Sequence, residues 1–409
     1  MKVTIVGGGV CGLTLALALH ERGIRCEILE AEPELRELGV GISLLPHGAE
    51  VMRGLGILSE LQRRAVEFRE SCFFNRHGQL IYRDPATPGF PQLLIHRADL
   101  QTALATAVRE RLGSEGLALG RRCAGVSQDS AGAVVHLVDP ATGEPAGDRR
   151  ADVVIGCDGI HSRVRRHFYP REGEPIYSGT TMWRGVTRHP PILSGGSHAR
   201  IGTVDPGKMV IYPIRDHVDD RGRQLMNWVA EVSDAAYEPP DWTRPGRIEA
   251  FLPRFMDWTF DWLDVPDLVR RADVVLEFPM SDRDPVDAWA FERVALAGDA
   301  AHPMIPRGSN GAMQAILDAR VLADRLAAGS DPVAALRAYE AERLPRANRV
   351  VLTNRSTPPD YLIQVVEERT GFQPFDRLED VISRDELTQI LDGYKRIAGY
   401  DRDALASRG

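Results

Sequence analysis

Three consecutive glycines near the start of the chain constrain its fold more than any other feature. The chain begins MKVTIVGGGVCGLTLALALHERGIRCEILEAE, where Val3, Ile5 and Val6 predict a short buried strand. The Leu- and Ala-rich stretch 11–22 predicts a helix that ends before Gly23, and 25–29 predicts a second strand. Because glycine loses more conformational freedom on folding than any other residue, three together between a strand and a helix need a structural reason.

The spacing Gly7-x-Gly9-x-x-Gly12 provides that reason. Between a strand and a helix, this spacing is typical of a dinucleotide-binding turn. Gly7 permits a tight turn, Gly9 leaves room for a pyrophosphate, and Gly12 brings the helix close to the strand. The helix N-terminus presents free amides to the phosphates. Glu30, after the second strand, could accept hydrogen bonds from a ribose, which favours a cofactor without a 2′-phosphate. The alternative is a tightly packed turn without a ligand.

Composition excludes several other classes of protein. At 409 residues the chain is expected to form about two domains, and no apolar run approaches the ~20 residues of a membrane span. A first strand from Lys2 leaves no room for a signal peptide. The net charge of −8 argues against nucleic-acid binding. Five cysteines without a C-x-x-C pair indicate neither disulfides nor a metal site, so we predict a cytoplasmic protein.

Two later stretches repeat the pattern of a strand followed by glycine. In ADVVIGCDGIHSRVRRHF, an apolar strand leads into Asp158-Gly159, with Ser162 and Arg165 after it. In RVALAGDAAHPMIPRGSNGAMQAI, a strand leads into Gly298-Asp299, at the strand end where ligands bind in open α/β sheets. Each stretch alone could be an ordinary turn. Their order behind the glycine motif makes the set much more specific.

These ordered motifs resemble the single-component, class A flavin monooxygenases of the para-hydroxybenzoate hydroxylase fold. The segments TMWRGVT, MVIYPI, MNWVAEV and FPMSDRDPVDAW look more narrowly like 5-methylphenazine-1-carboxylate 1-monooxygenase and its relatives. The resemblance extends from Met1 to about Arg355. The remaining residues are interpreted from their pattern alone, as a C-terminal helical region.

The resemblance implies non-covalently bound FAD, with NAD(P)H as a transient reductant. No second G-x-G-x-x-G follows a strand, which fits a transient NAD(P)H site on the FAD domain. The backbone amides of 309–312 would face the flavin pyrimidine ring. The residues implied for FAD are Gly7, Gly9, Val10, Cys11, Gly12, Glu30, Ala31, Gly41, Ile42, Arg97, Cys123, Asp158, Asp299, Gly308, Ser309, Asn310, Gly311 and Ala312.

The pattern of strands predicts an α/β fold with a second domain. Residues 72–82 predict a hairpin, and several β-like runs between 180 and 232 predict an antiparallel sheet inserted into the Rossmann-like FAD domain. We expect FAD-domain segments at 1–70, 96–175 and 281–350. Substrate-domain segments are expected at 71–95 and 176–280, and the C-terminal helices at 351–409.

The substrate site is predicted mainly from the run KMVIYPI, in which Lys208, Val210 and Tyr212 share a face. A phenol combines an apolar ring with a hydrogen-bonding tip, so Tyr212 is the best candidate for the cavity. By resemblance, Pro306 lines the substrate site. Arg307, in PRGSNG where many relatives have P-x-x-G-Q-G, could bind a carboxylate, face solvent or pair with FAD. His47 could polarise the substrate or be an ordinary loop residue.

The activity implied by the resemblance is hydroxylation of an aromatic or heteroaromatic compound, with oxygen transferred from a flavin hydroperoxide. Decarboxylative hydroxylation, epoxidation and Baeyer–Villiger oxidation use the same flavin chemistry and remain alternatives. A flavin-binding redox sensor and a nicotinamide-only dehydrogenase are alternatives of other classes. The predicted partners are an aromatic substrate and dioxygen, and we expect a monomer or a homodimer.

Overall fold

The first predicted strand lies inside a six-stranded sheet of order β20-β21-β12-β1-β2-β8. In this computed structural model, which describes residues 1–35, 39–233 and 245–407, the five strands from β21 to β8 are parallel and β20 is antiparallel. Val3 and Ile5 are fully buried, as their branched side chains predict. The strands are β1 (Lys2–Val6), β2 (Arg25–Leu29), β8 (Leu117–Ala118), β12 (Val153–Gly156), β20 (Ala290–Phe291) and β21 (Val294–Leu296).

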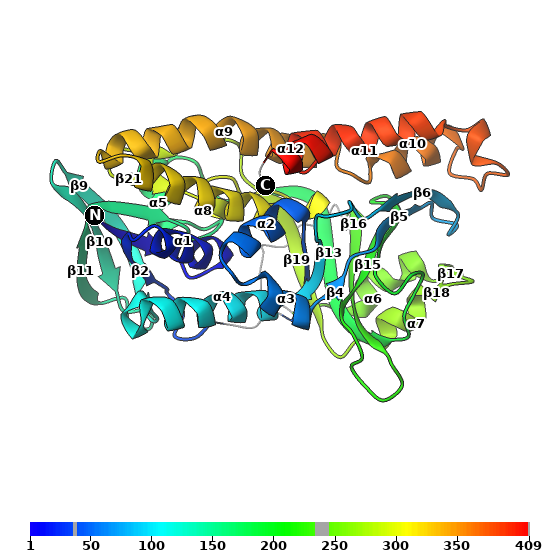
Figure 1. Cartoon of the computed structure of the whole chain (residues 1–409). Helices are drawn as coiled ribbons and strands as arrows, with labels where there is room; N and C mark the ends of the chain where they lie inside the picture. Colours follow the sequence, from blue (N-terminus) through cyan, green and yellow to red (C-terminus); the bar gives the residue numbers. More distant parts are fainter. Residues whose placement is uncertain (36–38, 234–244, 408–409) are drawn as a thin grey trace.

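Helices and a small sheet cover this central sheet (Figure 1). Helix α1 (Val10–Glu21) contacts both α4 (Arg97–Leu112) and α8 (Gly311–Ala328), so residues 11–19 are all buried. Gly23, with φ of 69°, follows the helix end as predicted. An antiparallel sheet contacts β1 and β12, and its strand β9 contacts α5 (Arg163–Phe168). Its strands are β9 (Arg122–Asp129), β10 (Gly132–Val138) and β11 (Pro145–Ala151).

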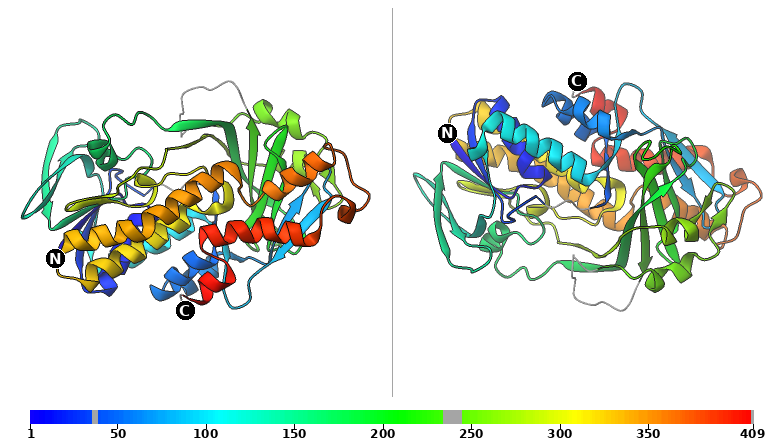
Figure 2. Two further views of the ribbon diagram at one scale, coloured as in Figure 1. Left: turned by 90° about the horizontal axis from the view of Figure 1, so that it is seen from above. Right: turned by 90° about the horizontal axis from the view of Figure 1, so that it is seen from below.

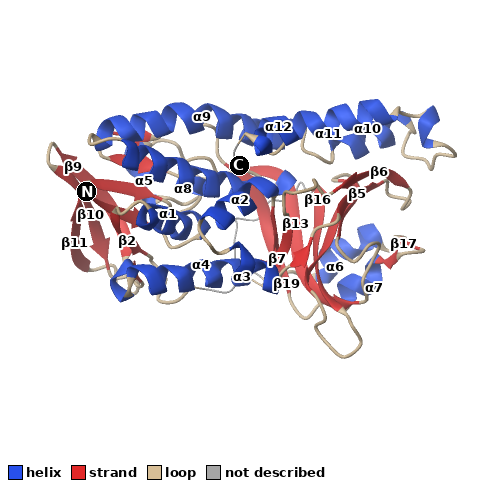
Figure 3. Ribbon diagram, in the orientation of Figure 1, coloured by secondary structure: helices blue, strands red, loops and turns tan. Residues whose placement is uncertain are grey.

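The second domain contains a seven-stranded sheet of order β19-β13-β16-β15-β14-β5-β6 (Figure 3). All its neighbours pair antiparallel except β14 with β5. The predicted hairpin at 72–82 is confirmed, since β5 pairs with β6 and Gly78 has φ of 77° at the turn. The strands are β5 (Glu70–Phe74), β6 (Leu80–Pro85), β13 (Ile176–His189), β14 (Ser197–Thr203), β15 (Gly207–Arg215), β16 (Gln224–Ser233) and β19 (Val275–Asp282).

Short elements cover one face of this sheet and connect it to the first. A buried aromatic cluster that includes Trp228 and Phe251 lies between the sheet and α6 (Ile248–Phe251), α7 (Val265–Arg270), β17 (Thr259–Phe260) and β18 (Leu263–Asp264). A three-stranded sheet of order β3-β7-β4 contacts β15. Its strands and the helices beside it are β3 (Gly41–Leu44), β4 (Val66–Glu67), β7 (Leu93–His96), α2 (Pro46–Gly54) and α3 (Leu58–Arg64).

The C-terminal helices run along one side of both domains. Helix α9 (Pro332–Ser356) lies beside α8, and the helices after it continue toward the β5–β6 hairpin (Figure 2). They are α10 (Tyr361–Arg369), α11 (Arg384–Ala398) and α12 (Arg402–Ala406). Apolar side chains from α10 and α11, such as Leu362 and Leu391, pack on Phe73 and Ile81 of the hairpin.

The architecture confirms the predicted α/β fold with an antiparallel second sheet and C-terminal helices. Four of the predicted segment limits fall within elements, since β5 spans 70–71, β7 spans 95–96, β19 spans 280–281 and α9 spans 350–351. The division into segments therefore stays a prediction. None of the helices in the described ranges has the length and apolar character needed to cross a membrane.

Candidate active site

Close contacts with backbone atoms determine where the glycine turn, residues 7–12, needs glycine. Gly7 has φ of 107°, and a side chain there would collide with the carbonyl oxygen of Cys157. A side chain at Gly12 would collide with the carbonyl oxygen of Gly7. Gly9 differs from both, because its φ is −76° and a Cβ there would meet no atom within 4 Å. Protein packing therefore requires glycine at the first and third positions, and the second faces open space.

Glu30 lies beside this turn, at the carboxyl end of β2. Its carboxylate accepts hydrogen bonds from the N–H groups of Gly8 at 2.6 Å and Glu32 at 2.9 Å. Glu30 and its neighbour Ala31 lie outside the lining of the cavity described next.

A cavity of about 360 Å³ lies between the glycine turn and the seven-stranded sheet. Its lining comes from the N-termini of α1 and α8, the strand β3, and the strands β13 to β16. The predicted residues that line it are Gly9, Val10, Cys11, Gly41, Ile42, Arg97, Tyr212, Asp299, Pro306, Ser309, Asn310, Gly311 and Ala312. The predicted residues outside the lining are Gly7, Gly12, Glu30, Ala31, His47, Cys123, Asp158, Arg307 and Gly308.

The Asp-Gly motif supports the site from behind the cavity wall. Asp158 accepts hydrogen bonds from the N–H groups of Arg163 at 2.7 Å and Val164 at 3.2 Å, and from the Ser162 hydroxyl at 2.5 Å. Burial raises the pKa of its carboxyl group despite these bonds. Asp158 thus stabilises the start of α5, while its neighbours Cys157 and Gly159 line the cavity.

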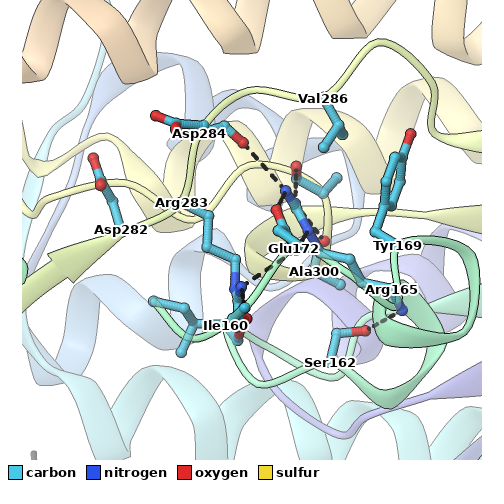
Figure 4. Close-up of polar contacts among 12 residues, drawn as sticks. Ile160, Ser162, Arg165, Tyr169, Glu172, Asp282, Arg283, Asp284, Val286 and Ala300 are labelled. Carbon is cyan, nitrogen blue, oxygen red and sulfur yellow. Dashed lines mark hydrogen bonds and ion pairs between the residues drawn. The ribbon is translucent and has the colours of Figure 1, made fainter. Parts of the chain in front are cut away.

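Arg165, three residues beyond Ser162, connects this motif to the loop between β21 and α8. Its buried guanidinium donates to the carbonyl oxygens of Ala300 at 3.0 Å and Ala301 at 2.7 Å. Figure 4 shows the same side chain paired with Glu172, which also pairs with Arg283. The motif therefore positions the β21–α8 loop, defined here as residues 297–310.

A second buried cluster holds the start of the β21–α8 loop. Asp318 of α8 accepts hydrogen bonds from the Gly298 N–H at 2.9 Å and from Arg343 Nε at 2.7 Å, and its carboxylate lies 2.5 Å from His302 Nε2. Burial raises the pKa of Asp318, but the charges of His302 and Arg343 outweigh it and hold the pKa below its ordinary value. Asp299, next to Gly298, lines the cavity.

Sequence reasoning missed Asp318 and Arg343, although one signal was present. Asp318 lies on the apolar face of the predicted helix, three residues after Ala315, where an acid is unexpected unless it is paired.

The far wall of the cavity is largely apolar. Val210 and Tyr212 line it together, which confirms that they share a face of β15. Tyr212 stacks on His198 with ring centroids 4.6 Å apart. A Cβ at Gly41 would lie 2.8 Å from the Tyr212 ring, so β3 packs closely on β15. Burial lowers the pKa of His198 well below its ordinary value, which keeps that ring neutral.

Charged residues that were not predicted also line this wall. Arg184 of β13 donates to the Gly41 carbonyl oxygen at 2.7 Å, and burial lowers the pKa of its guanidinium. Glu231 of β16 binds Lys208 Nζ at 3.1 Å and lies 3.7 Å from Nε of Arg307. Arg307 therefore lies behind Glu231 instead of facing the cavity. The signal for Arg184 was its place in the segment TMWRGVT, which alternates like a strand.

Two predicted residues lie in packed interior regions away from the cavity. His47 is buried in α2 and stacks on Tyr400 with ring centroids 5.3 Å apart. Cys123 of β9 is buried, and its thiol contacts the Gly125 carbonyl oxygen at 3.5 Å. His47, predicted for the substrate, and Cys123, implied for FAD, both lie outside the lining of the cavity. The His47 ring packs against Tyr400 from the C-terminal region, and Cys123 lies in the core of its sheet.

Comparison with known proteins identifies the family. The FAD-binding domain family matches residues 1–354. The chain belongs to the class A FAD-dependent aromatic monooxygenases. It is 39% identical to the phenazine 1,6-dicarboxylic acid hydroxylase PhzS of Lysobacter antibioticus, over 86% of this chain and 89% of that protein. It is 32% identical to the 3-amino-4-hydroxybenzoate 2-monooxygenase PtmB3 of Streptomyces platensis, over 100% and 98%.

A solved structure shows the same fold. The salicylate hydroxylase substrate complex superposes with a TM-score of 0.75 at 24% identity, covering 100% of this chain and 97% of that chain. The monooxygenase binds FAD and uses NAD(P)H and dioxygen as co-substrates. Its geometry fits a bound dinucleotide, because the open space at Gly9 and the N-termini of α1 and α8 face one cavity.

Proposed function

We propose that this monooxygenase hydroxylates a flat, carboxylated aromatic or heteroaromatic acid of the phenazine type. The relative of highest identity named above acts on a phenazine dicarboxylic acid, and the other acts on an aminohydroxybenzoate. Both substrates named there combine an aromatic ring with a carboxylate. The cavity described above has an apolar wall that suits the ring and an arginine that suits the carboxylate.

The apolar part of that surface suits a ring system. Met182, Val210, Val229, Met304 and Pro306 contribute to one lining. Such a wall removes a flat ring from water, and burial of apolar area is the main source of affinity in small-molecule sites.

The observation that carries the proposal is the guanidinium of Arg184 at this apolar wall. Its Nε atom is buried and makes no hydrogen bond within the described residues, although Nη2 is bonded to Gly41. Glu231 is already balanced by Lys208 and Arg307. A buried donor without a partner costs free energy, so a substrate carboxylate is the ligand that this arginine favours.

Arg307 has a supporting part in this proposal. We infer that it neutralises Glu231 together with Lys208, so that the glutamate does not repel an anionic substrate. Tyr212 and Pro306 would contact the ring, and His47 would support α2 from within the core.

The same proposal assigns the cofactor residues. Gly9, Val10 and Cys11 would contact the pyrophosphate, Glu30 the ribose, and Asp299 the ribityl chain. The amides of 309–312 would face the isoalloxazine, where reduction places negative charge. When bound, FAD would supply the redox chemistry, in which NAD(P)H provides two electrons, one oxygen atom of dioxygen enters the substrate and the other leaves as water. The protein's own residues exclude water and hold the ring in place.

The test compares carboxylated rings with a ring lacking the carboxylate. We expect phenazine-1-carboxylate to stimulate NAD(P)H oxidation and dioxygen uptake, with a product heavier by one oxygen atom, and unsubstituted phenazine to do so only weakly. Equal stimulation by both compounds would contradict carboxylate recognition. Product mass and carbon dioxide release also separate hydroxylation from epoxidation, Baeyer–Villiger oxidation and decarboxylative hydroxylation.

A pair of variants on one strand locates the carboxylate site. Arg184→Met should raise KM for the carboxylated substrate by about tenfold or more, because a hydrogen bond to a charged group contributes about 1.5–3 kcal/mol. Arg188→Met is the control, since Arg188 lies on the same strand with 54% of its side chain exposed. An unchanged KM in Arg184→Met would exclude this arginine as the carboxylate ligand.

The cellular setting is part of the proposal as well. All five cysteines are free thiols, which supports a reducing cytoplasm. We keep the expectation of a monomer or homodimer, which light scattering of the purified protein would decide.

A further inference from the structure

A buried chain of polar side chains connects the C-terminal helices to the candidate flavin loop. The hydroxyl of Tyr394, on α11, accepts a hydrogen bond from Asn310 Nδ2 at 2.9 Å. The same hydroxyl donates to Asn354 Oδ1, on α9, at 2.8 Å. Tyr394 is 3% exposed and both asparagines are fully buried, so these bonds are shielded from water.

The two asparagines extend this chain to both ends of one loop segment. Asn310 Nδ2 also donates to the Gly308 carbonyl oxygen at 3.0 Å. Asn354 Nδ2 donates to the Ile305 carbonyl oxygen at 3.3 Å. The Tyr394 hydroxyl therefore connects the start and the end of the loop segment 305–310. Three residues of this segment, Pro306, Ser309 and Asn310, line the cavity.

This segment needs outside support because its backbone is strained. Gly308 has φ of 77° and Ser309 has φ of 58°, a left-handed conformation that serine adopts rarely. Such conformations persist only where the surrounding structure fixes them. A side chain at Gly308 would collide with the Tyr394 hydroxyl, which shows how closely α11 covers the turn.

We propose that Tyr394 is a positioning residue of the FAD site, acting through Asn310 to fix the amides of 309–312. This inference rests on the proposed placement of those amides at the isoalloxazine ring. It extends the cofactor site to α11, which lies beyond the 1–354 region matched by the family. Amides held rigidly at a site of developing negative charge stabilise the reduced ring more than mobile ones, because no reorganisation is needed.

The test replaces single hydroxyl groups on neighbouring tyrosines. Tyr394→Phe removes the hydroxyl that joins the two asparagines, so Asn354 Oδ1 loses its hydrogen bond and Asn310 Nδ2 keeps only its bond to Gly308. The variant should therefore weaken FAD binding to the apoprotein about tenfold. It should also lower the midpoint potential of bound FAD. Tyr400→Phe is the matched control, because that ring lies 6.4 Å from the Tyr394 ring and its hydroxyl makes no hydrogen bond within the described ranges. Tyr400→Phe should leave both quantities unchanged.

Each outcome decides the inference. Wild-type FAD affinity and potential in Tyr394→Phe would overturn it, whether or not the melting temperature falls, because a merely structural tyrosine would affect stability alone. If Tyr394→Phe does not fold, Asn354→Ala takes its place with the same two readouts. Failure of both variants to fold would also overturn it, since the cluster would then support the whole fold. Neither readout uses a substrate, so an error in the proposed substrate class would not affect the result.

Discussion

Two loops meet at the cavity, and they are held in opposite ways. The glycine turn, 7–12, is shaped by contacts of backbone with backbone, in which the absence of side chains at Gly7 and Gly12 is the requirement. The β21–α8 loop is held by side chains of Arg165, Asp318 and Tyr394, which come from three different helices.

This difference in the kind of contact determines which substitutions disturb each loop. The glycine turn depends on backbone contacts among its own residues and with Cys157, directly after β12. The β21–α8 loop depends on buried polar groups, and a single lost partner leaves a desolvated group behind. We therefore expect distant substitutions to affect the second loop and to leave the first intact.

Removal of the charge on Asp318 should have the largest effect. Asp318→Asn leaves the buried Arg343 without its anionic partner, so we expect a loss of about 3–5 kcal/mol in the free energy of unfolding. Urea denaturation measures it. Asp324→Asn is the control on the same helix, because Asp324 is 48% exposed and its surface ion pair should contribute little. A loss below about 1 kcal/mol in Asp318→Asn would show that the loop does not depend on this cluster.

Gly12→Ala should have the next largest effect. We expect the free energy of unfolding to fall by about 3 kcal/mol, because the added methyl group displaces the backbone at Gly7. Gly9→Ala gives the comparison within the same turn and should unfold like the wild type, since its Cβ meets open space. Similar destabilisation by both substitutions would mean that the turn is not shaped by backbone contact.

Gly9→Val should affect the cofactor and not the fold. The φ of −76° at Gly9 is ordinary for valine, so the protein alone tolerates the side chain. If the pyrophosphate occupies that space, a loss of about 3 kcal/mol in binding weakens FAD affinity roughly a hundredfold. Fluorescence titration of the apoprotein measures it. A variant that retains full FAD affinity would remove Gly9 from the pyrophosphate site.

The smallest expected effect is a pH dependence of the stability that Asp318 gives to the β21–α8 loop. The backbone contacts of Gly7 and Gly12 in the glycine turn involve no titrating group and should show no such dependence. The pKa of Asp318 is lower in the folded state, so its contribution is present above the unfolded-state pKa of about 3.9 and is lost as pH falls through the folded-state pKa. The difference in unfolding free energy between wild type and Asp318→Asn should stay constant from pH 8 to about pH 4 and shrink below it. A difference that shrinks near neutral pH would contradict this assignment.

The same contrast explains what could be predicted from the sequence. The spacing of Gly7, Gly9 and Gly12 predicted the turn between strand and helix. The alternation of residues in β15 predicted that Val210 and Tyr212 share a face. Of the three polar anchors of the second loop, only Arg165 was noticed, as part of the Asp-Gly motif, and its contact with the loop was not predicted. Asp318 and Tyr394 were not predicted at all. A hydrogen bond such as that of Asn310 with Tyr394 joins residues 84 positions apart and leaves no periodic pattern.

Arg307 and His47 were predicted as possible substrate contacts but lie outside the cavity lining. Their positions next to sequence motifs suggested contact with the substrate, but which way a side chain turns depends on its neighbours. Glu231 holds Arg307 behind the wall, and Tyr400 covers the His47 ring. Local pattern predicts which element carries a residue, and tertiary packing determines which side of the wall its functional group occupies.

The distance between Asn310 and Tyr394 also sets an order of events during synthesis. At about 5–20 residues per second, a ribosome adds the 84 residues between them in roughly 4–17 s. When Asn310 is made, the backbone contacts of Gly7 with Cys157 and of Gly12 with Gly7 can already form, whereas the β21–α8 loop still lacks its phenol partner. If the pyrophosphate lies at Gly9 and the ring at 309–312, as proposed, the site for the phosphate end of FAD forms before the site for its ring, which is complete only after α11 has been made.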